Sequence, residues 1–158
     1  MNHRPIMFKI IALFFGVVLL ASNAAAADSP YRQVADGVVV YLGVLPAAMV
    51  QGRHEGDPEA VMHDGIPRGR HAFHVTVSVF DAGSGNQIKD AQVTARVAPL
   101  GLAGVTRPLE TMRIDDTVSY GHYFTLRGEA RYDIEITIAR PGADAPVTVS
   151  FTYARPPR

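Results

Sequence analysis

Hydrophobic and polar side chains alternate with a period of two along most of the chain after residue 70. In residues 71–80, one face consists of Phe73, Val75, Val77 and Val79, and the other of His74, Thr76 and Ser78. A period of two is that of a β-strand with one buried face and one exposed face. No stripe of apolar residues at helical spacing stands out. The pattern therefore predicts a β-protein.

Seven segments of strand length are predicted. They are residues 37–45, 71–80, 88–98, 109–114, 118–126, 131–138 and 147–153. Turn-forming residues separate several of them, including residues 81–87 and the Asp115-Asp116 pair. Short strands at this spacing, each with one wet side and one dry side, predict an all-β fold, an immunoglobulin-like antiparallel β-sandwich. A barrel with a similar number of strands is the alternative.

The first 27 residues have the composition of a secretory signal peptide. Arg4 and Lys9 precede an apolar run at residues 10–21, and small side chains follow at residues 22–27. The run is shorter than the roughly 20 apolar residues that span a bilayer. We therefore predict a cleaved signal peptide of residues 1–27 and export of the chain. A retained membrane anchor is the alternative.

One domain is predicted after the signal peptide. It covers residues 28–153 and includes a long irregular loop at residues 46–70, which is rich in Gly, Pro, His and acids. A stretch of that length without periodicity is usually functional or disordered. The proline-rich residues 154–158 are predicted to form a frayed tail.

Composition excludes several classes of function. The chain has 15 Lys and Arg against 15 Asp and Glu, and signal cleavage removes Arg4 and Lys9, which leaves a slightly acidic domain. Such a domain lacks the basic surface that nucleic-acid binding requires. The absence of cysteine excludes disulfides, a lipid-modified cysteine, thiol catalysis and thiolate metal sites.

The order of the strand motifs resembles a known group of bacterial domains. A strand reading HVTVSVFDAGSG is followed by IKDAQVTARV, SYGHYFTL and YDIEITIARPG. This order is similar to YtkA-like and FixH-like domains and, more distantly, to CopC-type copper-resistance sandwiches. The resemblance covers about residues 73–153. It implies a periplasmic immunoglobulin-like accessory domain of the kind often encoded near copper or oxidase-assembly systems. YtkA-like domains commonly carry a methionine-containing loop where this chain reads PLGLAG at residues 99–104.

Potential metal ligands concentrate in one segment. His54, Met62, His63, His71 and His74 fall within 21 residues. Imidazole suits Cu(II), Zn and Ni, and thioether selects Cu(I), so this set in an exported protein points first to copper. On a regular strand His71 and His74 lie on opposite faces, and only a bulge would bring both to one ion. The alternative is a solvated loop, with His74 on a polar sheet face and His71 at a strand end.

A second histidine site involves the strand at residues 118–126. His122 lies between Tyr120 and Phe124 on an apolar face, and we predict a core histidine bonded to a backbone carbonyl. The alternative is a pair with Met112, because residues 109–114 and 118–126 could form a hairpin through the Asp115-Asp116 turn.

No catalytic motif is present. The chain lacks a Gly-x-Ser-x-Gly elbow, an HExxH motif and a phosphate-binding glycine loop. The sequence therefore predicts no enzymatic activity. The main hypothesis is an exported envelope accessory or interaction module that binds an envelope protein partner through an edge strand or through residues 46–70. The alternative is a periplasmic copper-binding protein that uses the His/Met cluster.

Overall fold

The structure, a computed structural model, describes residues 29–50, 65–128 and 131–156. Eight strands and one short helix are found there, in the order β1 Arg32–Ala35, β2 Val38–Pro46, α1 Ala47–Val50, β3 Ala72–Asp81, β4 Gln92–Pro99, β5 Val105–Ile114, β6 Thr117–Thr125, β7 Arg131–Ala139 and β8 Val147–Ala154. The prediction of an all-β fold is confirmed. No helix in this part of the chain is both long and apolar enough to span a membrane. The predicted signal peptide lies outside the described residues.

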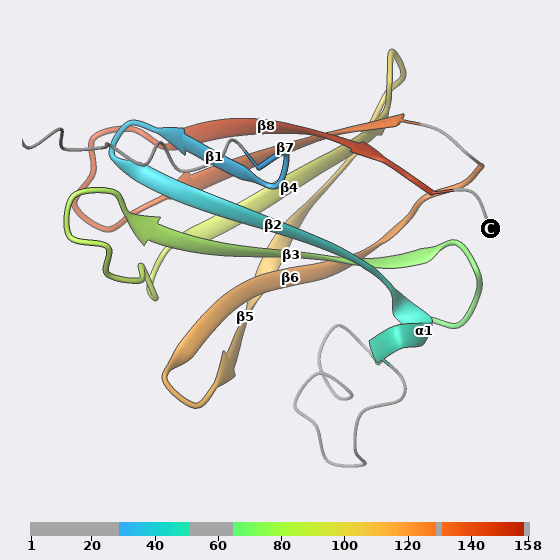
Figure 1. Cartoon of the computed structure of the whole chain (residues 1–158), viewed down its shortest axis with the longest axis horizontal. Helices are drawn as coiled ribbons and strands as arrows, with labels where there is room; N and C mark the ends of the chain where they lie inside the picture. Colours follow the sequence, from blue (N-terminus) through green and yellow to red (C-terminus); the bar gives the residue numbers. More distant parts are fainter. Residues whose placement is uncertain (1–28, 51–64, 129–130, 157–158) are drawn as a thin grey trace, which may run out of the picture.

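The strands form a sandwich that nearly closes on itself. Their order is β1-β2-β3-β6-β5-β4-β7-β8, and all neighbours are antiparallel. Strand β5 crosses between the two layers, since its first half pairs with β4 and its second half with β6. Strand β1 contacts β8 at the other side, and Figure 1 shows β1, β8, β7 and β4 over β2, β3 and β6. The architecture therefore combines features of the predicted sandwich and of the alternative barrel.

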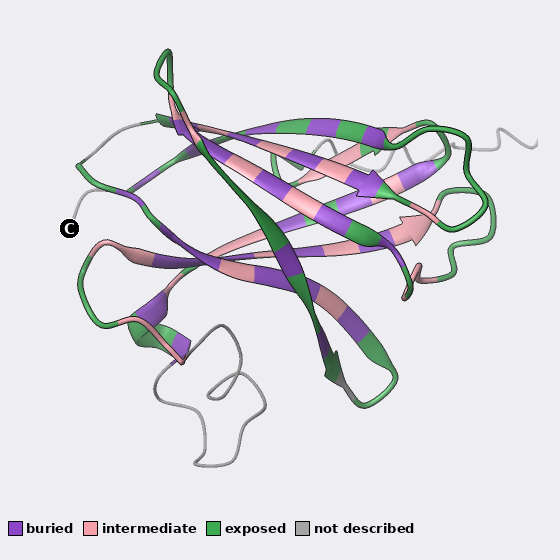
Figure 2. Ribbon diagram, turned by 180° about the vertical axis from the view of Figure 1, so that it is seen from behind, coloured by how far each residue is buried: buried purple, intermediate pink, exposed green. Residues whose placement is uncertain are grey.

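The core lies between the two layers. The apolar faces predicted for residues 71–80, 131–138 and 147–153 all point into it. Figure 2 shows the resulting alternation of buried and less buried positions along the strands. The buried Tyr120 hydroxyl donates to the Ile88 carbonyl at 3.0 Å and accepts from the Ala91 amide at 3.1 Å. These bonds hold the segment before β4, which therefore begins at Gln92 rather than at the predicted residue 88.

Three other boundaries differ from the sequence prediction. Strand β1 was not predicted; it pairs with β2 through a two-residue turn in which Asp36 and Gly37 both have positive φ, at 44° and 74°. Strand β5 begins at Val105 rather than at residue 109, because β4 pairs with its first half. Strand β8 continues to Ala154, and Arg155, in the segment predicted to fray, is buried.

Candidate functional site

The outer face of strands β3, β5 and β6 carries buried side chains that do not belong to the core. His74 and Met112 are each 3% exposed and Tyr123 is 8% exposed, yet none of the three belongs to the core cluster between the layers. Helix α1 contacts β2 and β3, and its Ala47 and Val50 are buried. A face that strand alternation predicts to be wet is therefore buried at this place.

Gly121 lies at the centre of this patch. A Cβ atom on Gly121 would stand 2.6 Å from Nε2 of His74 and 2.8 Å from Cε of Met112, both well inside van der Waals contact. The imidazole and the thioether thus meet over the same glycine, in space that any other residue would fill. Glu110 pairs with Gly121 in the β5–β6 ladder and so lies on the same face.

Tyr123 orients the histidine. His74 and Tyr123 are paired across β3 and β6, and their ring centroids lie 4.7 Å apart with the planes tilted by 31°. A ring packed in this way loses rotational freedom, so the direction of Nε2 toward Gly121 is held by the sheet itself. The site is built on strands rather than on loops, which favours fixed geometry.

The structure does not bring His71 and His74 together. The β3–β6 register runs without interruption from Ala72 to Val77, so no bulge turns His71 toward the outer face. His71 instead accepts a hydrogen bond at Nε2 from Nε of Arg70, at 3.1 Å. Partial burial and the nearby Arg70 and Arg155 lower the pKa of His71 below 6.5. The other predicted ligands, His54, Met62 and His63, lie outside the described residues.

Met112 and His122 lie on opposite faces of the sheet. Met112 pairs with Ser119, so it shares its face with Gly121 and not with His122. The half-buried His122 is 3.1 Å from NH1 of Arg107 through its Nε2. A guanidinium can only donate, so Nε2 is the acceptor in this contact. The alternative Met112–His122 pair does not form; Met112 meets His74, a contact that the sequence analysis missed.

The donor set is that of a soft-metal site. Within the ranges that the structure describes, no three His, Cys, Asp or Glu side chains converge into a metal-binding group. The patch offers instead one imidazole nitrogen and one thioether sulfur, with a carboxylate on the same face. Nitrogen and thioether donors suit copper, and a thioether favours Cu(I). The imidazole and the thioether lie side by side over Gly121, and their donor types fit such an ion.

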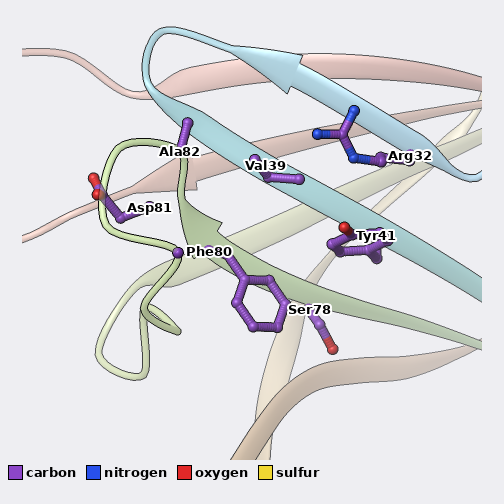
Figure 3. Close-up of a pocket in the computed structure, with 8 residues that line it drawn as sticks. Arg32, Val39, Tyr41, Ser78, Phe80, Asp81 and Ala82 are labelled. Atoms are coloured by element: carbon purple, nitrogen blue, oxygen red, sulfur yellow. The ribbon is translucent and has the colours of Figure 1, made fainter. Parts of the chain in front are cut away.

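A separate groove of about 570 Å³ lies farther along the outer face of β2 and β3. Figure 3 shows Tyr41 and Phe80 along it, with Arg32 beside them. The two aromatic rings meet edge to face at 5.7 Å, and the Arg32 guanidinium lies 6.0 Å from the centre of the Tyr41 ring. Tyr41 is 45% exposed. This groove offers apolar and aromatic contact surface but no metal ligands of the soft type.

Comparisons with known proteins find solved structures of similar fold, but no similar sequence. No protein-family model and no curated protein sequence matches the chain. A DUF4426 family protein from Pseudomonas aeruginosa is similar in structure, with 19% identity over 80% of this chain and 94% of that one, and a TM-score of 0.59. FetP of uropathogenic Escherichia coli, expressed in the periplasm, is 12% identical over 78% of this chain and 91% of its own, with a TM-score of 0.60.

Copper-bound proteins are among these structures. The copper-reconstituted P19 protein of Campylobacter jejuni is 12% identical, covers 78% of this chain and 91% of its own, and has a TM-score of 0.55. A variant of FetP has also been solved with copper bound. At these identities the likeness shows a shared fold. That fold, rather than membership of the YtkA-like or FixH-like domains, is what the comparisons support.

Proposed function

We propose that this chain is an exported, non-enzymatic accessory protein of the periplasm that binds copper. His74 supplies an imidazole nitrogen and Met112 a thioether sulfur, and Glu110 lies beside them on the same face. The observation that carries the proposal is the meeting of both side chains over Gly121, where a Cβ would stand 2.6 Å from Nε2 of His74 and 2.8 Å from the Cε methyl of Met112. The copper-bound proteins that share the fold support the choice of metal, as does the more distant resemblance to CopC-type sandwiches.

The burial of the donors bears on which copper state the site favours. Met112 and His74 are each 3% exposed, so a bound ion would sit away from bulk water. A thioether in such surroundings favours Cu(I), whereas imidazole accepts both oxidation states. We therefore expect tighter binding of Cu(I) than of Cu(II), with the difference carried by Met112.

Copper titration of the purified protein tests the proposal. Thermal stability is followed while Cu(I), under anaerobic conditions, or Cu(II) is added. An ion that binds only the folded state stabilises it by about 2.7 kcal/mol at a concentration one hundred times its Kd. His74→Ala should abolish the stabilisation by either ion, and Met112→Leu, which keeps the volume, should weaken Cu(I) more than Cu(II).

Two further variants distinguish the possible sites. His122→Ala removes a half-buried histidine from the opposite face of β6 and should leave the copper response unchanged. His63→Ala tests the ligand set predicted from the sequence. If copper stabilises the His74→Ala and Met112→Leu variants as strongly as the original protein, the site over Gly121 is wrong. A loss confined to His63→Ala would return the site to the long loop.

The aromatic groove supports a second candidate function, an interaction module for an envelope protein partner. Its walls carry Tyr41 and Phe80, with Arg32 and Asp81 also lining it. Aromatic side chains flanked by both charges suit an extended peptide segment. Tyr41→Ser should then weaken binding of an envelope partner identified by cross-linking in intact cells, whereas His74→Ala should not. Unchanged binding by Tyr41→Ser would exclude the groove.

A further inference from the structure

The loop between β4 and β5 presents exposed apolar side chains. Leu100, Leu102 and Val105 are 57%, 66% and 54% exposed, and we call them the apolar tip. No charged residue occurs between Pro99 and Val105. Figure 1 shows the loop standing clear of the sandwich, and Figure 2 shows its exposure. Large apolar side chains gathered on one exposed loop mark a surface that binds something.

The loop is held in place rather than loosely attached. The Leu102 amide donates to the Pro99 carbonyl at 2.9 Å, and the Leu100 amide donates to the Arg131 carbonyl at 2.9 Å. A Cβ on Gly104 would stand 2.9 Å from the Val97 carbonyl oxygen, so the two strands approach closely at the base of the loop. The apolar tip is therefore presented in a fixed position.

Arginines lie at the same end of the sandwich. Arg70, Arg127 and Arg131 are exposed, and we call them the arginine cluster. Arg131 bonds the apolar tip through its carbonyl. The buried Arg155 joins two of these segments, since its NH2 donates to the Arg70 carbonyl at 3.4 Å and its NH1 to the carbonyl of Gly128, the residue after Arg127, at 2.6 Å.

Arginines outnumber acids around the arginine cluster. The described residues of the segments that meet here, 65–71, 100–104, 126–128, 131–133 and 155–156, contain five arginines and one acidic side chain, Asp133. After the effect of burial, Arg70, Arg155 and Arg127 all lower the pKa of the neighbouring His71. An apolar tip beside clustered arginines combines the two elements by which peripheral proteins bind anionic membranes.

We propose that the apolar tip and the arginine cluster dock the protein on the surface of an anionic lipid bilayer. The leucines enter the boundary between headgroups and acyl chains, and the guanidinium groups bind lipid phosphates. The convex, protruding shape of the tip favours a bilayer as the occupant, because a protein partner would need a matching cavity. The face over Gly121 lies on the strands rather than on this tip, so docking and copper binding use different surfaces.

Vesicle sedimentation tests this proposal. The purified protein should bind vesicles of phosphatidylcholine mixed with phosphatidylglycerol, bind phosphatidylcholine alone much more weakly, and dissociate as salt is raised. Leu100→Ser with Leu102→Ser should reduce the partition coefficient by about tenfold or more. Arg127→Gln and Arg131→Gln should each reduce it by about fivefold.

Matched variants elsewhere provide the controls. Val34→Ser changes an exposed apolar residue on β1, and Arg113→Gln an exposed arginine on β5; both should bind vesicles as the original protein does. Because all the positions changed are exposed, the melting temperatures should stay the same, which separates docking from folding. Absence of binding to anionic vesicles overturns the proposal, as does binding that the leucine variant retains in full. Displacement by inorganic phosphate beyond that by chloride at equal ionic strength would assign the arginines to free phosphate instead.

Discussion

Replacement of Gly121 by alanine is the sharpest test of the patch on the outer face. Gly121 does not have positive φ, so the substitution strains no backbone angle and acts only through the added methyl group. That methyl would stand 2.6 Å from Nε2 of His74 and 2.8 Å from Cε of Met112. Both side chains are buried, and overpacking of this kind costs about 1–3 kcal/mol. For a domain of this size that corresponds to a fall in Tm of roughly 3–15 °C.

The same substitution should weaken copper binding by at least about tenfold, because it separates the two donors. Gly104→Ala is the matched control. Its Cβ would stand 2.8 Å from Cβ of Ala98 and 2.9 Å from the Val97 carbonyl oxygen, at the β4–β5 connection and away from the donors. Calorimetry should show a comparable loss of stability in both variants, and copper titration a loss only in Gly121→Ala. Equal copper affinity in the two variants would refute the role given to Gly121, and an unchanged Tm for Gly121→Ala would refute the packing itself.

Three further predictions concern the framework. Tyr120→Phe removes the acceptor of the buried Ala91 amide, so the free energy of unfolding in urea should fall by about 1–3 kcal/mol. Arg155→Ala breaks the bond to the Gly128 carbonyl and should lower it by about 1.5–3 kcal/mol. Burial and neighbouring arginines hold the pKa of His71 in the folded protein below 6.5. As the pH falls, His71 is therefore protonated at a higher pH in the unfolded chain than in the folded protein. Stability should therefore fall as the pH drops below 6.5, and His71→Gln should flatten this part of the pH profile. A profile unchanged by that variant would contradict the assignment.

The faces of the strands could be predicted because they depend on local alternation alone. The strand boundaries were harder to predict, because they depend on residues far along the chain. Strand β4 starts late because Tyr120, in another strand, bonds the residues before it. Strand β1 was missed although its signal is present. An Asp-Gly pair such as Asp36-Gly37, directly before an apolar strand, is a strong short-range hairpin signal, and both residues adopt the positive φ that such a turn requires.

The sequence allows one part of the candidate site to be predicted and not the other. The two-residue turn at Asp115-Asp116 fixes the β5–β6 register, and this alone places Met112 and His122 on opposite faces. That incompatibility could have been derived from the sequence. The meeting of Met112 with His74 could not, because it requires the pairing of β3 with β6, which are separated by two other strands in the chain.

The burial on the outer face is itself an argument for function. Stability alone would be served by apolar, β-branched residues on such a face, because they pack well on a pleated surface and carry no polar atoms. The chain places a histidine, a methionine and a glycine there instead, with His74 nearly as buried as the core valines on the other side of the same strand. Glycine in a strand interior weakens the strand and marks a place where something approaches closely. If the patch serves copper binding rather than packing, His74→Val with Met112→Ile should keep the free energy of unfolding and abolish copper binding. A double variant that loses stability instead would show that the patch serves packing.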